Sequence, residues 1–296
     1  MTPSRLFQNQ DDTARRYAGL IRGSFRERYL PFVVAGLVLL VALIALVRLE
    51  FSFARLGSGL VQLATFLGLM VPPSPGPQLI ALLKALSETV AIAFLGTLLA
   101  AIISFPLGLL AARNTTVNSV VQFATRRFSD TIRGVDTLIW ALIWINVVGL
   151  GPFAGVLAIM TSDIGSFSKL YSEAIEAVDR KASEGVRSSG GSRFQAIRFG
   201  VIPQVIPVLI SQTLYYFESN TRSATIIGIV GAGGIGLYLA EMIRTYEWDR
   251  VAFIILMILV TVGIIDFISS RLRLALVGRA VRVLDRHPPR HDGADA

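Results

Sequence analysis

The chain contains a series of long uncharged stretches, and they restrict its fold more than any other feature. These stretches are 29–47, 89–112, 137–162, 199–217, 223–240 and 251–265. A helix needs about 20 mostly apolar residues to cross the hydrocarbon core of a bilayer. A buried strand, in contrast, needs only about 4–8 apolar residues. Several of the stretches reach membrane length, so the sequence predicts an all-α membrane protein.

The stretches predict about six transmembrane helices. We place them at about 31–48, 82–112, 134–150, 153–171, 203–230 and 250–270. Only 16% of the residues are charged, against about 25% in soluble domains. The chain then divides into a basic tail (1–29), a first transmembrane helix (30–48), an external segment (49–81), a core (82–275) and a second tail (276–296). The apolar part of the external segment, 56–71, ends in a proline cluster and is expected to form an interfacial or re-entrant helix.

The distribution of positive charge predicts the orientation of these helices. With both termini cytoplasmic, the cytoplasmic pieces are 1–29, 113–133, 169–198 and 271–296. They hold six, four, six and six Lys and Arg residues, together 22 of the 28 in the chain. Cytoplasmic loops of membrane proteins carry an excess of Lys and Arg. The net charge of +8 therefore indicates topology, and no nucleic-acid partner is expected.

Few side chains are available for metal binding or covalent catalysis. The chain has no cysteine, and its two histidines, His287 and His291, lie in a C-terminal tail. Pro288 and Pro289 between them prevent the helix that would align the two rings as metal ligands. We therefore expect a solvated tail, no metal site and no catalytic residue.

The segment 231–236 matches G-x-G-x-x-G, the fingerprint of a dinucleotide-binding turn. It lies between two stretches of membrane length and not after a short strand, so a nucleotide site is not expected there. The glycines of this region are Gly228, Gly231, Gly233, Gly234 and Gly236. Small residues let helix backbones approach closely in membranes. We predict a gate or helix break near the outer membrane face, and close helix packing without gating is the alternative.

A long charged stretch, 172–200, separates the fourth and fifth predicted spans. Its first part, 176–187, is compatible with a helix, and Gly190 and Gly191 allow a tight bend. A short helix at about 192–199 is expected to follow. It carries Arg193, Phe194, Ile197 and Arg198. The stretch thus predicts a protruding helical elbow with a mixed apolar and basic face, although an ordinary helical hairpin is the simpler alternative.

Gly190 follows Glu184 of this stretch by six residues, and Pro203, just after the stretch, follows thirteen residues later. This pattern resembles the signature loop of the membrane subunits of ABC importers, which has a Glu-Ala-Ala triplet, a glycine and an Ile-x-Leu-Pro ending. The sequence departs from that pattern at Gly185, Val186, Gly200 and Ile202. The resemblance covers about 83–275. It implies a five-helix permease core like that of methionine importers, with one additional N-terminal helix.

In that family the elbow fits into a groove on a cytoplasmic ATPase. The resemblance therefore implies ATPase-coupling roles for Glu184, Gly185, Arg187, Gly190, Gly191, Arg193, Phe194 and Pro203. The chain lacks the phosphate-binding motif G-x-x-x-x-G-K-[ST], so ATP and magnesium are expected on a partner ATPase dimer and no cofactor on this chain. An extracytoplasmic binding protein and a second permease copy, forming a homodimer, complete the implied assembly in the inner membrane of a bacterium.

A closer resemblance is to the permease subunit of phosphonate importers. It is carried by LYYFESNTRSATIIGIVGAGGIG at 214–236, by LLAARNT at 109–115 and by YSEAIEAVD at 171–179. The resemblance implies an anion with phosphonate-like oxygens as the substrate. Phosphonate, phosphite and phosphate remain open.

The fifth predicted span carries an unusual number of polar side chains. Six of them share one helical face at i+3 and i+4 steps. They are Ser211, Tyr215, Glu218, Ser219, Arg222 and Thr225. We interpret this face as lining the translocation path, with Arg222 neutralising an anion; a structural Glu218–Arg222 pair is the alternative. Asp163 and Asp266 are expected at the membrane interface.

Two other classes of function are weighed against the importer. An ion-coupled secondary transporter of small anions would need inverted repeats and ionisable residues at the membrane midplane, and the sequence shows no such repeat. An intramembrane enzyme has few possible catalytic residues here, because the predicted spans contain no His or Cys and no clustered carboxylates. The secondary transporter would also leave the charged elbow at 172–200 unexplained.

Overall fold

The computed structural model describes residues 25–49 and 52–285. Within these ranges the chain forms helices and no strand, which confirms the predicted all-α class. The chain separates into two units, Met1–Phe66 and Leu67–Ala296. Each unit is described by itself.

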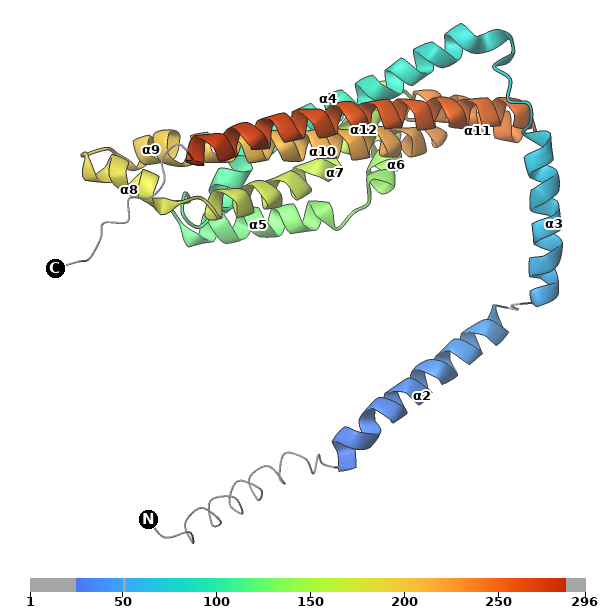
Figure 1. Ribbon diagram of the computed structural model, residues 1–296, viewed down its shortest axis with the longest axis horizontal. Helices are drawn as coiled ribbons and strands as arrows, with labels where there is room; N and C mark the ends of the chain where they lie inside the picture. The colour runs from blue at the N-terminus through green and yellow to red at the C-terminus, as the bar shows by residue number, and fades with distance from the viewer. Residues whose placement is uncertain (1–24, 50–51, 286–296) are drawn as a thin grey trace. The chain divides into compact units, whose positions relative to one another are not determined.

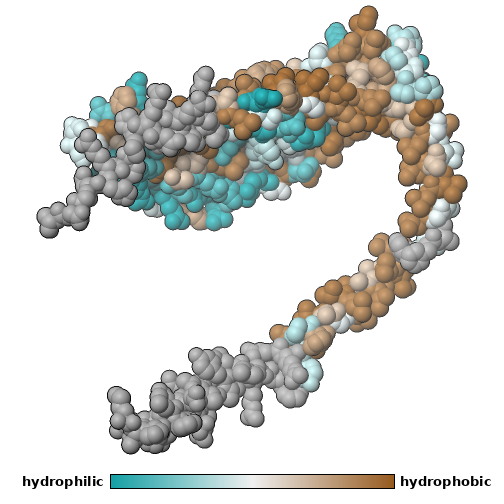
Figure 2. Space-filling view, in the orientation of Figure 1, coloured by the Kyte–Doolittle hydropathy of each residue, from teal (hydrophilic) through white to brown (hydrophobic). Residues whose placement is uncertain are grey.

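The first unit is dominated by one hydrophobic helix. α2 (Phe25–Arg48) contains a 20-residue segment, Tyr29–Arg48, that is long and apolar enough to cross a membrane. The unit leaves this segment wholly uncovered, and its surface is hydrophobic in Figure 2. A helix that is apolar all round requires an apolar environment, which a bilayer supplies. α3 (Phe53–Leu69) follows and runs across the boundary between the two units.

The second unit is a helical bundle (Figure 1). Its elements are η1 (Gly76–Gln78), α4 (Leu79–Ala111), α5 (Ser119–Arg133), α6 (Thr137–Val148), α7 (Pro152–Glu176), α8 (Arg180–Ser188), α9 (Arg193–Ala196), η2 (Ile197–Val201), α10 (Ile202–Ile229), α11 (Ile235–Arg244) and α12 (Trp248–Asp285). The short helices α8 and α9 lie at one end of the bundle and α11 at the other (Figure 1).

α7 is the central helix of the bundle, because it packs along α4 and also contacts α5, α6 and α10. Glycine makes the approach of α4 to α7 close. A Cβ atom at Gly96 would lie 2.8 Å from Ile159, and one at Gly108 would lie 2.7 Å from Tyr171. Small residues at helix crossings let backbones approach in this way in membrane proteins.

The number of apolar spans is lower than the six predicted from the sequence. Four helical segments of the described chain are long and apolar enough to cross a membrane, or five if the bent pair α5 and α6 counts as one span. The segments are Tyr29–Arg48, Gly76–Ala111, Arg193–Ile229 and Trp248–Ala275. α7, where we predicted a span at 153–171, is not among them. Its neighbours cover it, so its side chains need not be compatible with lipid.

The span predicted at 134–150 corresponds to α6, which is shorter than predicted. α6 has 12 residues, which gives a length of about 18 Å at 1.5 Å per residue. This is shorter than the ~30 Å hydrocarbon core of a bilayer. A bend of 87° separates α6 from α5, and Asp136 caps α6 by accepting a hydrogen bond from the amide of Leu138 at 2.8 Å.

The helical segments at both ends extend past the predicted tail boundaries. α2 begins at Phe25, inside the predicted tail 1–29, and α12 continues to Asp285, inside the predicted tail 276–296. The remaining tail predictions, including those for His287 and His291, lie outside the described residues.

Candidate functional site

The elbow predicted at 172–200 consists of α8 and α9 at one end of the bundle (Figure 1). α8 begins after Asp179, whose side chain accepts a hydrogen bond from the amide of Lys181 at 3.0 Å. The chain turns at Gly190, which has a φ of +84°, a backbone conformation open to glycine because it lacks a Cβ atom. Ser192 and Gln195 then form a capping box that starts α9.

The two arms of the elbow are in backbone contact. A Cβ atom at Gly191 would lie 2.6 Å from the carbonyl oxygen of Val186, and one at Gly200 would lie 2.7 Å from Cα of Ser183. The helix predicted at 192–199 is shorter than expected, because α9 ends at Ala196 and passes into a π-helical turn at 197–201. Pro203 then stands in the first turn of α10, where a missing amide hydrogen costs little.

The predicted coupling residues form the exposed surface of this elbow. Glu184, Gly185 and Arg187 are exposed on α8, and the Phe194 side chain is 71% exposed on α9. An exposed phenylalanine beside charged groups is typical of a surface that binds another protein.

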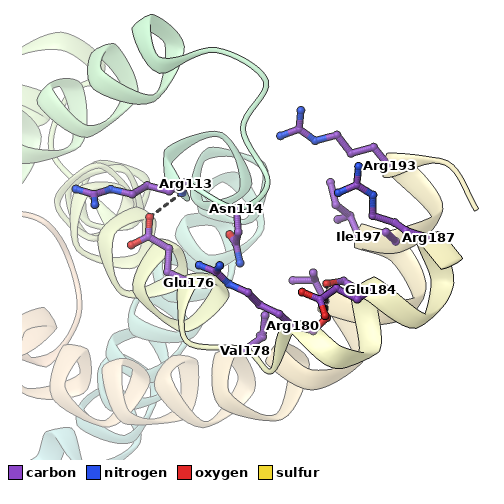
Figure 3. Close-up of a pocket in the computed structure, with 12 residues that line it drawn as sticks. Arg113, Asn114, Glu176, Val178, Arg180, Glu184, Arg187, Arg193 and Ile197 are labelled. Carbon is purple, nitrogen blue, oxygen red and sulfur yellow. Dashed lines mark hydrogen bonds between the residues drawn. The ribbon is translucent and has the colours of Figure 1, made fainter.

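A pocket of about 610 Å³ lies between the elbow and the loop that follows α4 (Figure 3). The side chains of Arg180, Glu184 and Arg187 come from α8, and Asn114 comes from the loop (Figure 3). The guanidinium of Arg193 donates hydrogen bonds to the carbonyl oxygens of Thr115 and Thr116. The elbow is therefore attached to the loop between α4 and α5.

The glycine segment joins α10 to α11 and forms a tight loop. Gly231, Gly233 and Gly234 have φ values of +107°, +84° and +75°, which other residues rarely adopt. A dinucleotide-binding turn requires a strand before the glycines, whereas here the helix α10 precedes them. The fingerprint at 231–236 is therefore not a Rossmann turn.

Two glycines bring α10 and α11 together. A Cβ atom at Gly236 would overlap the carbonyl oxygen of Thr225, and one at Gly228 would lie 2.5 Å from the carbonyl oxygen of Gly233. The loop also contacts the start of α7, because the amide of Gly151 donates to the carbonyl oxygen of Gly231 at 3.0 Å. The glycines thus permit close packing here, and the helix breaks between α10 and α11 at this loop.

The polar face of α10 contains an ion-pair cluster centred on Glu218, whose side chain is 11% exposed. One of its carboxylate oxygens lies 3.5 Å from Arg222 on the same helix. The other accepts a hydrogen bond from Arg273 of α12 at 3.2 Å. The Glu218–Arg222 pair that the spacing suggested is therefore present, and a second arginine joins it.

The six residues of the predicted face do not share one environment. Tyr215 and Arg222 are exposed, Ser211 and Ser219 are half-buried, and Glu218 and Thr225 are buried. The backbone carbonyl oxygen of Thr225 lies against Gly236 of α11. Thr225 is therefore separated from the accessible part of the face.

A cavity of about 430 Å³ opens beside the Glu218 cluster. It is lined by Leu170, Ser211, Gln212, Tyr215, Tyr216 and Arg273. The guanidinium of Arg273 lies 5.7 Å from the ring centroid of Tyr215, in cation–π contact. The cavity thus has one cationic wall and aromatic side walls.

Asp163 lies in the bundle core and not at the membrane interface, so the sequence-based placement was wrong. Its side chain is buried on α7 and accepts a hydrogen bond from the side-chain amide of Asn220 on α10. The same amide donates to Thr97 of α4 at 2.8 Å. Three helices are therefore linked by one buried polar network, and burial is tolerated because these polar groups are hydrogen-bonded.

Comparison with known proteins identifies the family. Residues 104–281, more than half of the chain, match the family described as the inner membrane component of binding-protein-dependent transport systems. The chain belongs to this family. The resemblance inferred from Glu184, Gly190 and Pro203 is confirmed.

Several relatives are similar to this permease over most of its length. HtxC of Stutzerimonas stutzeri, provisionally assigned as a phosphite transport system permease, is 40% identical over 84% of this chain and 87% of its own. The phosphite transport system permease PtxC of the same species is 35% identical over 73% of this chain and 78% of its own. The phosphate-import permease PhnE of Mycolicibacterium smegmatis is 35% identical over 85% of this chain, which spans 47% of that protein.

Solved structures show the same fold. The MetNI methionine ABC transporter, in an inward-facing conformation, matches with a TM-score of 0.59 at 19% identity over 69% of this chain and 99% of that chain. A bacterial alginate ABC transporter matches with a TM-score of 0.55 at 12% identity over 84% of this chain and 96% of that chain. The permease therefore has the fold of ABC-importer membrane subunits.

Sequence reasoning missed two polar contacts of this permease, Arg273 with Glu218 and Asp163 with Asn220. Arg273 was placed in the cytoplasmic piece 271–296, although the apolar residues Leu274, Ala275 and Leu276 follow it and signal that the helix continues. The Asp163–Asn220 contact had no sequence signal, because 57 residues separate the partners.

Proposed function

We propose that this permease carries a tetrahedral phosphorus oxyanion, such as phosphonate, phosphite or phosphate, across the inner membrane as part of an ATP-driven importer. One observation supports this substrate class. Two arginines, Arg222 and Arg273, both pair with the carboxylate of Glu218 beside the cavity between α10 and α12. The planar guanidinium group suits phosphate-like oxygens because it donates two parallel hydrogen bonds. The names of the relatives PtxC and PhnE support the same class.

The elbow is the proposed contact with a cytoplasmic ATPase dimer. Glu184, Arg187 and Phe194 present exposed charged and apolar groups, and Arg193 attaches the elbow to the α4–α5 loop. Motion of the ATPase would thus reach the bundle through both α10 and α4. ATP and magnesium would be bound by the ATPase, and this chain would perform no covalent chemistry and bind no cofactor.

The complete assembly would contain two copies of this permease and an extracytoplasmic binding protein. Two-fold symmetry is the commonest closed arrangement of identical chains. With both termini cytoplasmic, the elbow faces the cytoplasm and the glycine loop faces the binding protein. Gly231, Gly233 and Gly234, in conformations that favour glycine, are the proposed hinge of an outer gate.

The proposal is tested by the ATPase activity of the permease, co-purified with its ATPase and binding protein in lipid nanodiscs. Methylphosphonate, phosphite and phosphate are added in turn, and a Glu184→Arg variant serves as the control. We expect ligand-stimulated hydrolysis in the wild type and loss of stimulation in the variant.

Two results would contradict the proposal. If none of the three anions stimulates hydrolysis, the proposed substrate class is wrong. If no ATPase co-purifies and the permease alone moves anions in response to an ion gradient, it is a secondary transporter.

A further inference from the structure

Glu218 is bonded in the way that a substrate anion would be. Each of its two oxygens faces a different arginine, Arg222 at 3.5 Å and Arg273 at 3.2 Å. The carboxylate is largely buried, whereas Arg222 is 51% exposed. A carboxylate and a phosphorus oxyanion present similar negatively charged oxygens to a guanidinium group.

One residue that lines the cavity beside Arg273 carries a buried hydrogen-bond acceptor without a partner. Among the described residues, none donates a hydrogen bond to the buried Oε1 atom of Gln212, which belongs to a residue lining the cavity. A buried acceptor without a partner costs about 1–3 kcal/mol, so such an atom in a cavity indicates a missing donor. The volume of about 430 Å³ falls in the ~300–1,000 Å³ range of small-molecule sites.

A monoprotonated phosphorus oxyanion has the groups that this cavity lacks. Its charged oxygens match the guanidinium of Arg273, and its P–OH group is a donor for Oε1 of Gln212. The rings of Tyr215 and Tyr216, which meet edge to face at 5.9 Å, offer an apolar surface for the P–H or P–C substituent. Sulfate, which carries no proton near neutral pH, would leave Gln212 Oε1 unpaired.

We propose that Glu218 is a placeholder for the transported anion. In the substrate-free permease, its carboxylate neutralises the positive charges of Arg222 and Arg273. An arriving phosphorus oxyanion displaces the carboxylate from Arg273 and occupies the cavity lined by Gln212, Tyr215 and Tyr216. This inference rests on the proposed function and assigns it a site. Arg222, exposed one helical turn beyond Glu218, is the arginine that the anion meets before it reaches Arg273.

An exchange of this kind solves a physical problem of anion transport through a membrane. Unpaired arginines at membrane depth are costly, and a site with two free arginines would hold the anion too tightly. A transport site must bind strongly enough to admit the ion and weakly enough to release it. The carboxylate of Glu218 competes for the same guanidinium and thereby lowers the affinity for substrate.

Helix α12, which carries Arg273, provides matched controls. Asp266 of α12 also approaches Arg273, at 4.0 Å, but its side chain is 58% exposed, so it is a weaker competitor. Arg271 lies two residues from Arg273 and contacts the ring of Phe267 at 5.2 Å, outside the cavity. Arg271→Gln therefore removes the same charge as Arg273→Gln from outside the cavity, whereas Asp266→Asn removes only the weaker competitor.

The test is direct binding of methylphosphonate to the permease–ATPase complex in nanodiscs without the binding protein, measured by calorimetry. Glu218→Gln removes the competing charge and keeps the shape, so we expect binding about tenfold tighter than in the wild type, as for loss of one charge-assisted hydrogen bond. Arg273→Gln should abolish binding in both the wild-type and the Glu218→Gln background. Arg271→Gln should bind like the wild type, and Asp266→Asn should gain clearly less affinity than Glu218→Gln. Sulfate should bind more weakly than methylphosphonate in Glu218→Gln.

The outcomes separate this inference from the proposed function. If Glu218→Gln binds no tighter while the wild-type importer transports the anion, the placeholder role is wrong and the proposed function stands. If the Arg273→Gln chain fails to assemble, the Glu218→Gln affinity and the sulfate comparison still decide. If the complete wild-type importer transports no phosphorus oxyanion, the proposed function itself fails.

Discussion

The side chain of Glu88 accepts a hydrogen bond from the backbone amide of Gly234 at 2.9 Å, although 146 residues separate the two. The next residue, Thr89, accepts in the same way from the amide of Ile235 at 2.8 Å. Both amides belong to the start of α11, whose first amides have no partner within the helix. α4 thus supplies the N-terminal cap of α11 and holds the glycine loop against the bundle.

Replacing Glu88 by alanine should destabilise the permease. Two effects add: the amide of Gly234 loses its acceptor, and a negative charge is removed from the positive end of the α11 dipole, together about 1–2 kcal/mol. The melting temperature in detergent, followed by intrinsic tryptophan fluorescence, measures the change. Glu241→Ala, at an exposed position on α11, is the control, and an equal loss in both variants would refute the capping role.

Gly236→Ala should destabilise the contact of α10 with α11. The added methyl group would overlap the carbonyl oxygen of Thr225, and backbone shifts of this kind cost about 1–3 kcal/mol. At Gly263 of α12, an added Cβ atom would have no neighbour within 4 Å. Gly263→Ala should therefore be neutral or stabilising, because alanine favours a helix by about 1 kcal/mol. Thermal unfolding of the two variants side by side checks the difference in sign.

The buried network of Asp163, Asn220 and Thr97 predicts an asymmetry between two substitutions. Asn220→Ala removes the donor to both Asp163 and Thr97, which leaves a buried carboxyl group without its partner and costs about 1–3 kcal/mol or more. Asp163→Asn keeps an acceptor oxygen at the same place, so a smaller loss is expected. Denaturation midpoints of both variants test this order, with Asn146→Ala as an exposed control. The reverse order would show that the charge of Asp163, and not the hydrogen bonds, matters most.

Arg193→Ala should loosen the attachment of the elbow. Its guanidinium is the described donor to the carbonyl oxygens of Thr115 and Thr116, so its removal frees the α4–α5 loop. Hydrogen exchange should become faster at residues 115–118 and remain unchanged in α12. Arg198→Ala, which removes an exposed arginine stacked on Phe199 at 5.5 Å, is the matched control. Unchanged exchange at 115–118 would mean that other contacts hold the loop.

The predictable parts of the fold were those that depend on local sequence. The uncharged stretches predicted the apolar segments of α2, α4, α10 and α12, because a membrane helix must satisfy its own backbone and present apolar side chains to lipid. The elbow was also predictable, since Gly190 and the charged residues around it signal a bend with exposed helices. α7 was less predictable because neighbouring helices cover much of its surface. The bent pair α5 and α6 was less predictable because an 87° bend separates the two helices.

The candidate site was only half predictable, for a related reason. The pairing of Glu218 with Arg222 followed from their spacing of four residues on one helix. Arg273 and Asn220 meet their carboxylates across 55 and 57 residues of sequence, and no local pattern encodes such a distance. A charge at the end of an apolar stretch is compatible with both a loop and a buried ion pair.

The sequence by itself determined that this chain is a helical membrane protein of the binding-protein-dependent transport family, with an elbow before α10 and a polar α10. The helices, the elbow and the polar α10 follow from composition, periodicity and spacing, which act within one helix or one loop. The family follows from the resemblance of the elbow motif to known permeases. Only the tertiary structure decided that Glu218 forms ion pairs with two arginines, that Asp163 is buried, and that Glu88 and Thr89 cap α11. These contacts arise from helix packing, and because packing brings together residues distant in sequence, only the assembled bundle contains them.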